Sequence, residues 1–227
     1  MHDLGNIEAF RDPTNVRGGS YWGITTEQVS DVAAWVQLAR DRGFDRVVLV
    51  GHSAGATAVQ IYMARTQDPH VDGLVLASGR FQPASGPPVD PTRLARAKEL
   101  VAAGRGEEPV PPTAPAARPS PTSAATLVDL AGMGVELSDF YGVVTPNPPI
   151  ARVHVPILAW FGTNDDVGTA ADLELLKKTL KNLAGGPSRV DTAMIPRASH
   201  MYDGHEPAIA ETLANWVRDI ASAPRMR

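Results

Sequence analysis

The sequence predicts an α/β fold with a parallel sheet, and three observations support that expectation. Four short segments are rich in β-branched and other apolar residues. They lack the alternation of a strand with one solvated face, which is typical of parallel strands covered on both faces by helices. Amphipathic helical patterns lie around and between them, and alternating strands and helices along a chain indicate an α/β fold.

The expected strands are short apolar runs. They are Arg46 to Val50, Val71 to Ala77, Val155 to Phe161 and Val190 to Ile195. Helices are expected between and beyond them where apolar residues recur every three or four positions or where a start or stop residue marks an end. They are Thr25 to Arg42, Ala54 to about Arg65, Pro91 to Ala103, Thr169 to Ala184 and a last helix from about Pro207.

The segment from Arg80 to Pro121 does not show this alternation of strands and helices. Ten of the twenty prolines lie between Arg80 and Pro121, which excludes a strand there and most of a helix. We therefore expect one domain over 1–227, with 80–150 as a lid or insertion within it. Its apolar residues are expected to cover a site and to favour a hydrophobic substrate. These residues are Leu94, Leu100, Leu127, Leu130, Phe140 and Tyr141.

Composition excludes several classes of protein. The chain of 227 residues carries 21 Lys+Arg against 25 Asp+Glu, a formal net charge of −4 with both signs interspersed, so nucleic acid and membrane surfaces are poor partners. No apolar run is long enough for a membrane span, and the acidic N-terminus does not resemble a signal peptide, so a cytoplasmic location is expected. Zero cysteines exclude disulfides and a Cys nucleophile.

The first expected strand runs directly into Gly51-His52-Ser53-Ala54-Gly55, a GxSxG pattern in the context of strand, sharp turn and helix. Ser53 would sit on a strained turn with its Oγ above the strand end. Glycines two residues either side are expected because side chains there would collide across the turn. The helix that follows would aim its N-terminal amides at a reacting carbonyl oxygen.

A serine nucleophile needs a base and a carboxylate that orients the base. Asp165 lies in the Gly162-Thr163-Asn164-Asp165-Asp166 loop after the third expected strand, and His200 follows the fourth. The carboxyl ends of parallel strands share one edge of the sheet, so the three side chains can converge. Two neighbours stay open as alternatives: Asp166 for the acid and His205 for the base. His52 is expected to point away from Ser53 and to pack.

The sequence resembles the α/β-hydrolase superfamily at the GHSAG turn, the GTND loop and the ASHMYDGHE segment before the last helix. The resemblance implies a catalytic triad of Ser53, Asp165 and His200, with the Ala54 amide in the oxyanion hole. The order Ser, Asp, His is the one expected for this arrangement. No spacing resembles a metal site, so neither a metal nor another cofactor is predicted.

The N-terminal part is short for that superfamily, whose sheet has about eight strands. Only 46 residues precede Val47. We therefore expect a chain that begins after the superfamily's fourth strand, lacks the second oxyanion donor and is a feeble esterase. The first strand would become an exposed apolar edge, completed by upstream residues or by a second copy in a homodimer.

These observations predict a serine hydrolase that cleaves an ester, lactone or thioester of a hydrophobic small molecule through an acyl-enzyme. One alternative is a weak or inactive hydrolase-fold fragment that binds a small molecule or a protein. Another is an acyltransferase that uses the same triad, which sequence alone does not separate from a hydrolase.

Overall fold

The computed structural model describes residues 25–85, 89–111 and 122–222. Contacts divide the chain into two compact units. One takes in Ala84–Ser138 together with the chain up to Asp31, and the other takes in Val32–Pro83 and Asp139–Arg227. Helix α2 (Thr25–Asp41) crosses the boundary between them. The second unit carries the sheet and all the predicted site residues.

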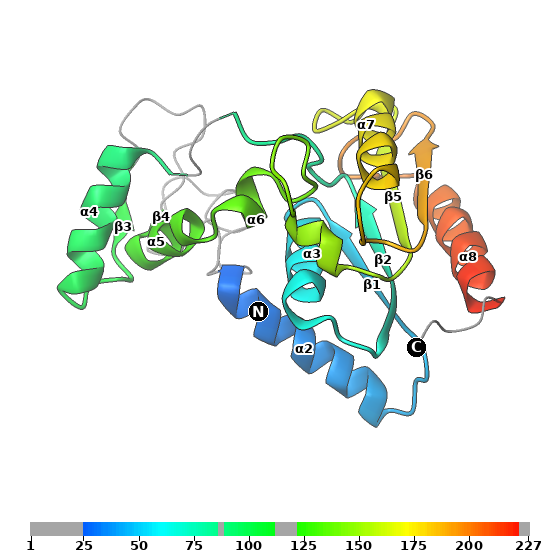
Figure 1. Ribbon diagram of the computed structural model, residues 1–227, viewed down its shortest axis with the longest axis horizontal. Helices are drawn as coiled ribbons and strands as arrows, with labels where there is room; N and C mark the ends of the chain where they lie inside the picture. The colour runs from blue at the N-terminus through cyan, green and yellow to red at the C-terminus, as the bar shows by residue number, and fades with distance from the viewer. Residues whose placement is uncertain (1–24, 86–88, 112–121, 223–227) are drawn as a thin grey trace. The chain divides into compact units, whose positions relative to one another are not determined.

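The central sheet is parallel, as the sequence predicts. Its order is β1-β2-β5-β6, and every pair of neighbours runs in the same direction (Figure 1). The strands match the four apolar segments closely: β1 (Val47–His52), β2 (Val71–Ala77), β5 (Ile157–Gly162) and β6 (Val190–Ile195). All four carboxyl ends therefore lie along one edge.

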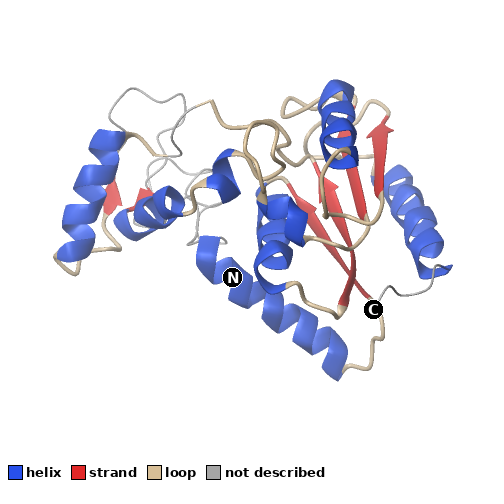
Figure 2. Cartoon of the chain, in the orientation of Figure 1, coloured by secondary structure: helices blue, strands red, loops and turns tan. Residues whose placement is uncertain are grey.

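Helices cover both faces of this sheet. On one face, Trp216 and Ile220 of α8 (Glu206–Ser222) pack against alternate residues of β2 and β5, such as Val75 and Trp160. The helices α3 (Ala54–Thr66) and α7 (Ala170–Lys181) lie against the other face, where β2 and β5 point their remaining residues (Figure 2). The short η1 (Pro149–Arg152) contacts α3.

The expectation of strands covered on both faces is correct for the centre and wrong for the edges. Nearly every residue of β2 and β5 is buried, whereas β1 and β6 are mostly half-buried. Val50 of β1 is 51% exposed. Among the described strands, β1 pairs only with β2, so one side of β1 is an edge.

The insertion has more structure than its prolines indicate. The predicted helix is present as α4 (Pro91–Ala102), capped by Asp90, whose side chain accepts a bond from the Arg93 amide. The sequence missed a two-stranded antiparallel ladder, β3 (Pro109–Val110) with β4 (Thr122–Ser123), and two helices, α5 (Ala124–Gly132) and α6 (Val135–Ser138). Ser123 caps α5, so this helix begins three residues after Pro121, the last proline of the segment.

Apolar residues of the insertion form a core of their own. Leu100 and Leu127 are buried in a core with Val110, and Leu94 and Leu130 pack against it. These leucines therefore stabilise the insertion itself, and its role as a cover stays a prediction.

The two predicted aromatic residues belong to the sheet unit instead. Phe140 and Tyr141 are buried there, and Tyr141 makes an edge contact with Phe81, 5.3 Å between ring centroids. The Tyr141 hydroxyl donates to Gln60 of α3, and burial raises the pKa of this phenol. The aromatic pair anchors the chain where it returns from the insertion.

In the described part of the chain, every helix is too short or too polar to cross a membrane.

Candidate active site

Ser53 stands on a strained turn between β1 and α3. Its φ of 54° is in the left-handed region, which a non-glycine residue rarely adopts, and its amide donates to the Ala77 carbonyl of β2 at 2.9 Å. A Cβ at Gly51 would lie 2.3 Å from the Gly55 carbonyl oxygen, so only glycine fits there. A Cβ at Gly55 would meet nothing within 4 Å. The expected collision thus exists at Gly51 and not at Gly55.

The Ser53 hydroxyl makes no hydrogen bond to the helix that follows it. Ser53 occupies the N-cap position of α3, yet its side chain makes no capping bond. Ala54 is the first helical residue, so its amide has no carbonyl to bond within the helix. A hydroxyl and an amide at the positive end of the helix dipole are therefore available at the same turn.

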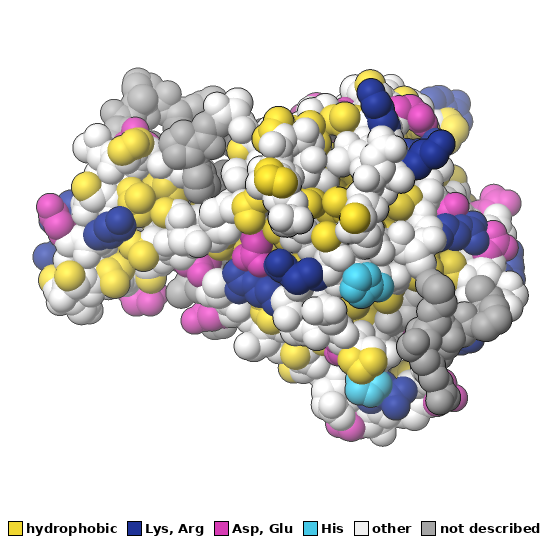
Figure 3. All heavy atoms as spheres, viewed as in Figure 1, with side chains coloured by type: hydrophobic (Ala, Val, Ile, Leu, Met, Phe, Trp, Pro, Cys, Tyr) yellow, Lys and Arg dark blue, Asp and Glu magenta, His cyan; other side chains and the backbone are white. Residues whose placement is uncertain are grey.

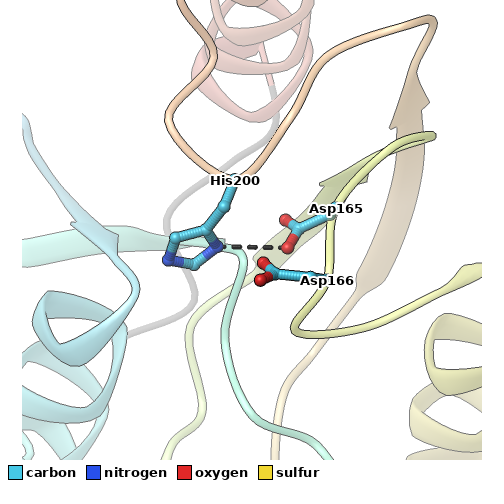
Figure 4. A group of neighbouring side chains, drawn as sticks. All are labelled: Asp165, Asp166 and His200. Carbon is cyan, nitrogen blue, oxygen red and sulfur yellow. Dashed lines mark hydrogen bonds and ion pairs between the residues drawn. The ribbon is translucent and has the colours of Figure 1, made fainter. Parts of the chain in front are cut away.

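Asp165 and His200 form a hydrogen-bonded pair, drawn in Figure 4. His200 Nδ1 lies 3.1 Å from Asp165 Oδ1. The side chain of Asp165 is fully buried, and that of His200 is 22% exposed. Asp165 Oδ1 also accepts from the Val167 amide at 2.9 Å. A carboxylate accepts only, so it holds the proton of the neutral imidazole on Nδ1 and leaves Nε2 as the basic nitrogen.

The loops that carry this pair are held tightly together. The Asn164 amide donates to the Ala198 carbonyl at 2.9 Å, and the Arg197 amide donates to Thr163 Oγ1 at 2.7 Å. A Cβ at Gly162 would lie 2.1 Å from the Ala198 oxygen. The glycine, threonine and asparagine of the GTND loop therefore seat the carboxylate beside the histidine loop.

Neither alternative left open by the sequence takes part in the Asp165–His200 hydrogen bond. Asp166 is exposed, and its carboxylate lies beside the imidazole in Figure 4, but His200 Nδ1 is bonded to Asp165. His205 pairs through Nδ1 with the carbonyl of Asp203, two residues away. The nearest ligand atoms of Asp165, Asp166 and His200 lie within 4.8 Å of one another. Asp165 Oδ1 accepts from His200 and Oδ2 accepts from Ser78, so each oxygen of this carboxylate has a side-chain donor.

His52, the residue before Ser53, contacts the loop that carries His200. His52 Nε2 lies 2.8 Å from the His200 carbonyl oxygen, and the two rings are 4.9 Å apart. His52 thus packs against the histidine loop, as expected. Between the described side chains of Ser53 and His200 there is no direct hydrogen bond. Catalytic hydrogen bonds are often long before substrate binds and shorten in the substrate complex.

Sequence comparison identifies the group to which this arrangement belongs. The model of the alpha/beta hydrolase family matches residues 12–212, most of the chain. The chain belongs to the alpha/beta hydrolase family. The resemblance seen at the three motifs and the predicted α/β fold are both confirmed. A comparison with curated protein sequences gives no match.

Solved structures of hydrolases share this fold at low sequence identity. Est1E from Butyrivibrio proteoclasticus superposes with a TM-score of 0.52 at 15% identity, covering 88% of this chain and 72% of that one. The Paleococcus ferrophilus monoacylglycerol lipase gives 0.50 at 16% identity, with coverage of 86% and 76%. The esterase domain of a Rhodothermus marinus protein gives 0.50 at 16%, with 92% and 72%. These similarities show the fold.

Sequence reasoning missed two residues of this hydrolase site. Ser78 follows β2 directly and donates to Asp165 Oδ2, and its Oγ lies 2.6 Å from the Tyr202 hydroxyl. Burial raises the pKa of the Tyr202 phenol, and the nearby Asp165 charge adds to the shift. Ser78 lies outside the three sequence motifs, and Tyr202 lies within the ASHMYDGHE segment without having been given a role there. The position of Ser78 in the sequence could have indicated it, because Ser78 directly follows β2, the one strand of the central sheet after which no functional residue was predicted.

Proposed function

We propose that this hydrolase cleaves an ester, lactone or thioester of a hydrophobic small molecule through a covalent acyl-enzyme. The observation that carries the proposal is the buried Asp165–His200 pair at the same sheet edge as Ser53. A base oriented by a carboxylate, beside a hydroxyl on a strained turn, is the combination that nucleophilic acyl transfer requires.

In the proposed mechanism, Ser53 Oγ attacks the acyl carbon while His200 Nε2 takes its proton. The amide of Ala54 donates to the oxyanion that forms, and the helix dipole of α3 adds to its stabilisation. His200 then passes the proton to the leaving alcohol or thiol. Water, deprotonated by the same imidazole, attacks the acyl-enzyme and releases the acid. Asp165 stabilises the imidazolium in both steps.

A hydrophobic substrate is favoured by apolar side chains beside the pair. Val167, two residues after Asp165, is 47% exposed, and Met201, directly after His200, is 64% exposed. Exposed apolar residues next to a reactive centre can hold an acyl chain. The proteins that share this fold support the same proposal, since they include a monoacylglycerol lipase and Est1E with bound ferulic acid.

A small, uncharged partner is also consistent with the surface. On the face drawn in Figure 3, acidic and basic side chains lie interspersed, and neither sign covers a broad area. The net charge of −4 adds no attraction for anionic polymers.

The test is hydrolysis of p-nitrophenyl esters of increasing chain length. We expect Ser53→Ala and His200→Ala to lose roughly 1000-fold or more in kcat. Ser30→Ala, which removes an exposed hydroxyl of α2, is the matched control and should retain full activity. Met201→Ser should raise KM for the longer esters more than for acetate, whereas the control Phe44→Ser, at a residue also more than half exposed, should not.

Other outcomes would identify a different function. Ester binding without turnover, unchanged by His200→Ala, would assign the site to a binding module. Turnover that forms a new ester or amide faster than free acid, when an alcohol or amine is added, would assign the same triad to an acyltransferase. Hydrolysis at the wild-type rate by Ser53→Ala would contradict the proposed nucleophile.

A further inference from the structure

The Asp165 carboxylate has a second side-chain partner besides the histidine. While Oδ1 accepts from His200 Nδ1 and from the Val167 amide, Oδ2 accepts from Ser78 Oγ. The Asp165 side chain is fully buried, so no water shell orients it. Its rotation about the Cβ–Cγ bond is therefore fixed by protein groups, and Ser78 is the described side chain that holds the oxygen facing away from the base.

Ser78 is itself held in an unusual conformation. It is 1% exposed, and its φ of 51° lies in the left-handed region. Its amide donates to the Trp160 carbonyl at 2.9 Å, which extends the pairing of β2 with β5 by one step. Such a conformation costs on the order of 1 kcal/mol or more and persists where the surroundings impose it. A strained backbone conformation thus places this hydroxyl at the end of β2.

A hydroxyl has one proton, which sets the direction of the chain of bonds. Because the carboxylate only accepts, Ser78 donates to Asp165 and consequently accepts from the Tyr202 hydroxyl, 2.6 Å away. Tyr202 also has a positive φ, 61°, and its ring lies 5.6 Å from that of His52. The bonds run Tyr202 to Ser78 to Asp165, with His200 donating to the same carboxylate from the other side.

We propose that Ser78 and Tyr202 are positioning residues that hold Asp165 against His200 in the orientation that general-base catalysis requires. This inference rests on the proposed function. Neither residue touches the reacting atoms. Without the Ser78 hydroxyl, Asp165 Oδ2 loses its side-chain donor, the carboxylate can turn, and the imidazole loses its fixed tautomer and orientation.

The experiment compares three variants of the full chain by two measurements. Ser78→Ala removes the donor to Asp165, and Tyr202→Phe removes only the second hydroxyl. Tyr62→Phe is the matched control, because it also deletes a buried hydroxyl that donates to an aspartate, Asp68, away from the site. The measurements are the rate at which a fluorophosphonate labels Ser53 and the low-field NMR resonance of the proton between His200 and Asp165.

We expect Ser78→Ala to slow labelling by about 10- to 100-fold, the range for a lost hydrogen bond to a charged group. Tyr202→Phe should slow it by about 2- to 10-fold, as for a bond between neutral groups, and Tyr62→Phe should leave it unchanged. The resonance should move or broaden in Ser78→Ala and stay in place in Tyr62→Phe. Tyr202→Phe keeps the test open even where Ser78→Ala does not fold.

An unchanged labelling rate or an unchanged resonance in Ser78→Ala would overturn the inference. A shift of equal size in Tyr62→Phe would also overturn it, since the effect would then follow lost stability. If the wild-type chain is not labelled at Ser53, the proposed function fails. The resonance, which needs no turnover, then decides by itself whether Ser78 holds the pair.

Discussion

Replacing Gly51 by alanine tests the turn on which the nucleophile stands. The added Cβ would lie 2.3, 2.5 and 2.6 Å from backbone atoms of Gly55 and Ala56. Real contacts of this kind essentially never fall below 3.0 Å, so the strand end and the helix start must separate by about 0.7 Å. No flexible side chain can absorb that movement, because all three obstructing atoms belong to backbone.

The expected cost follows from this displacement. Overpacking in a rigid site costs about 1–3 kcal/mol of unfolding free energy. For a chain of this size, that corresponds to a fall in Tm of roughly 2–12 °C. A misplacement approaching 1 Å at a reacting group can cost on the order of 100-fold in rate. Gly51→Ala should therefore be less stable and label with fluorophosphonate far more slowly.

Gly55→Ala is the matched control, since it makes the same change within the same five-residue motif. Its Cβ would meet nothing within 4 Å, and the position lies inside α3. Alanine at an unobstructed helical position is expected to leave stability equal or raise it by about 0.5–1 kcal/mol. Urea unfolding and labelling rates measured side by side check both variants. Equal behaviour of Gly51→Ala and Gly55→Ala would refute the asymmetry of the turn.

Three further predictions concern other parts of the sheet unit. Burial alone would raise the pKa of Asp139, but its hydrogen bonds to residues 143–145 outweigh that effect and lower the pKa below the usual 3.8. The contribution of Asp139 to the free energy of unfolding is therefore full above pH 3.8 and is lost as pH falls through the depressed pKa. Asp139→Asn should lower the free energy of unfolding at pH 7 by about 1–3 kcal/mol. In urea titrations, this free energy should also change less with pH in the variant than in the wild type. Gly162→Ala, whose Cβ would lie 2.1 Å from the Ala198 oxygen, should weaken the His200–Asp165 resonance as well as stability, and an unaltered resonance would contradict the described loop contact. We propose that two copies pair along the exposed edge of β1; Val50→Lys should then turn a dimer into a monomer in light scattering, and a wild-type monomer at high concentration would exclude the pairing.

The sequence predicted the sheet well because its strands are short, continuous apolar runs. In β2 and β5 those runs are buried on both sides, so their composition alone defines them. At the edges the same composition is misleading, since Val50 of β1 is exposed. Burial depends on which strands are neighbours, and local composition does not contain that order.

The insertion shows how proline density can mislead. The prolines predict little regular structure, yet α4 begins at Pro91, β3 contains Pro109, and α5 begins with a serine cap three residues after Pro121. The core formed by the leucines of the insertion was not predicted either. Leu100 and Leu127 have the spacing of amphipathic helices, and a helix buries its apolar face in whatever core is nearest, which here is the insertion's own.

The site residues divide in the same way. Ser53, Asp165 and His200 were singled out because each lies shortly after a recognisable strand, and the structure pairs the last two; their catalytic role stays a prediction. Ser78 and Tyr202 were not predicted, because a single serine carries no spacing signal and the motif that contains Tyr202 gives that residue no role. Their role depends on two contacts that are distant in sequence. Ser78 and Asp165 are separated by 87 positions, and Ser78 and Tyr202 by 124. The GxSxG pattern is symmetric, whereas the turn it forms is not.

The most direct test of the central claim is to locate the covalent adduct. The purified chain is treated with a fluorophosphonate, its intact mass is measured, and the modified peptide is sequenced by mass spectrometry. We expect one adduct per chain, on the peptide that contains Ser53, with labelling abolished by Ser53→Ala and greatly slowed by His200→Ala. An adduct on another residue, or labelling that persists in Ser53→Ala, would contradict the assignment of Ser53 as the nucleophile.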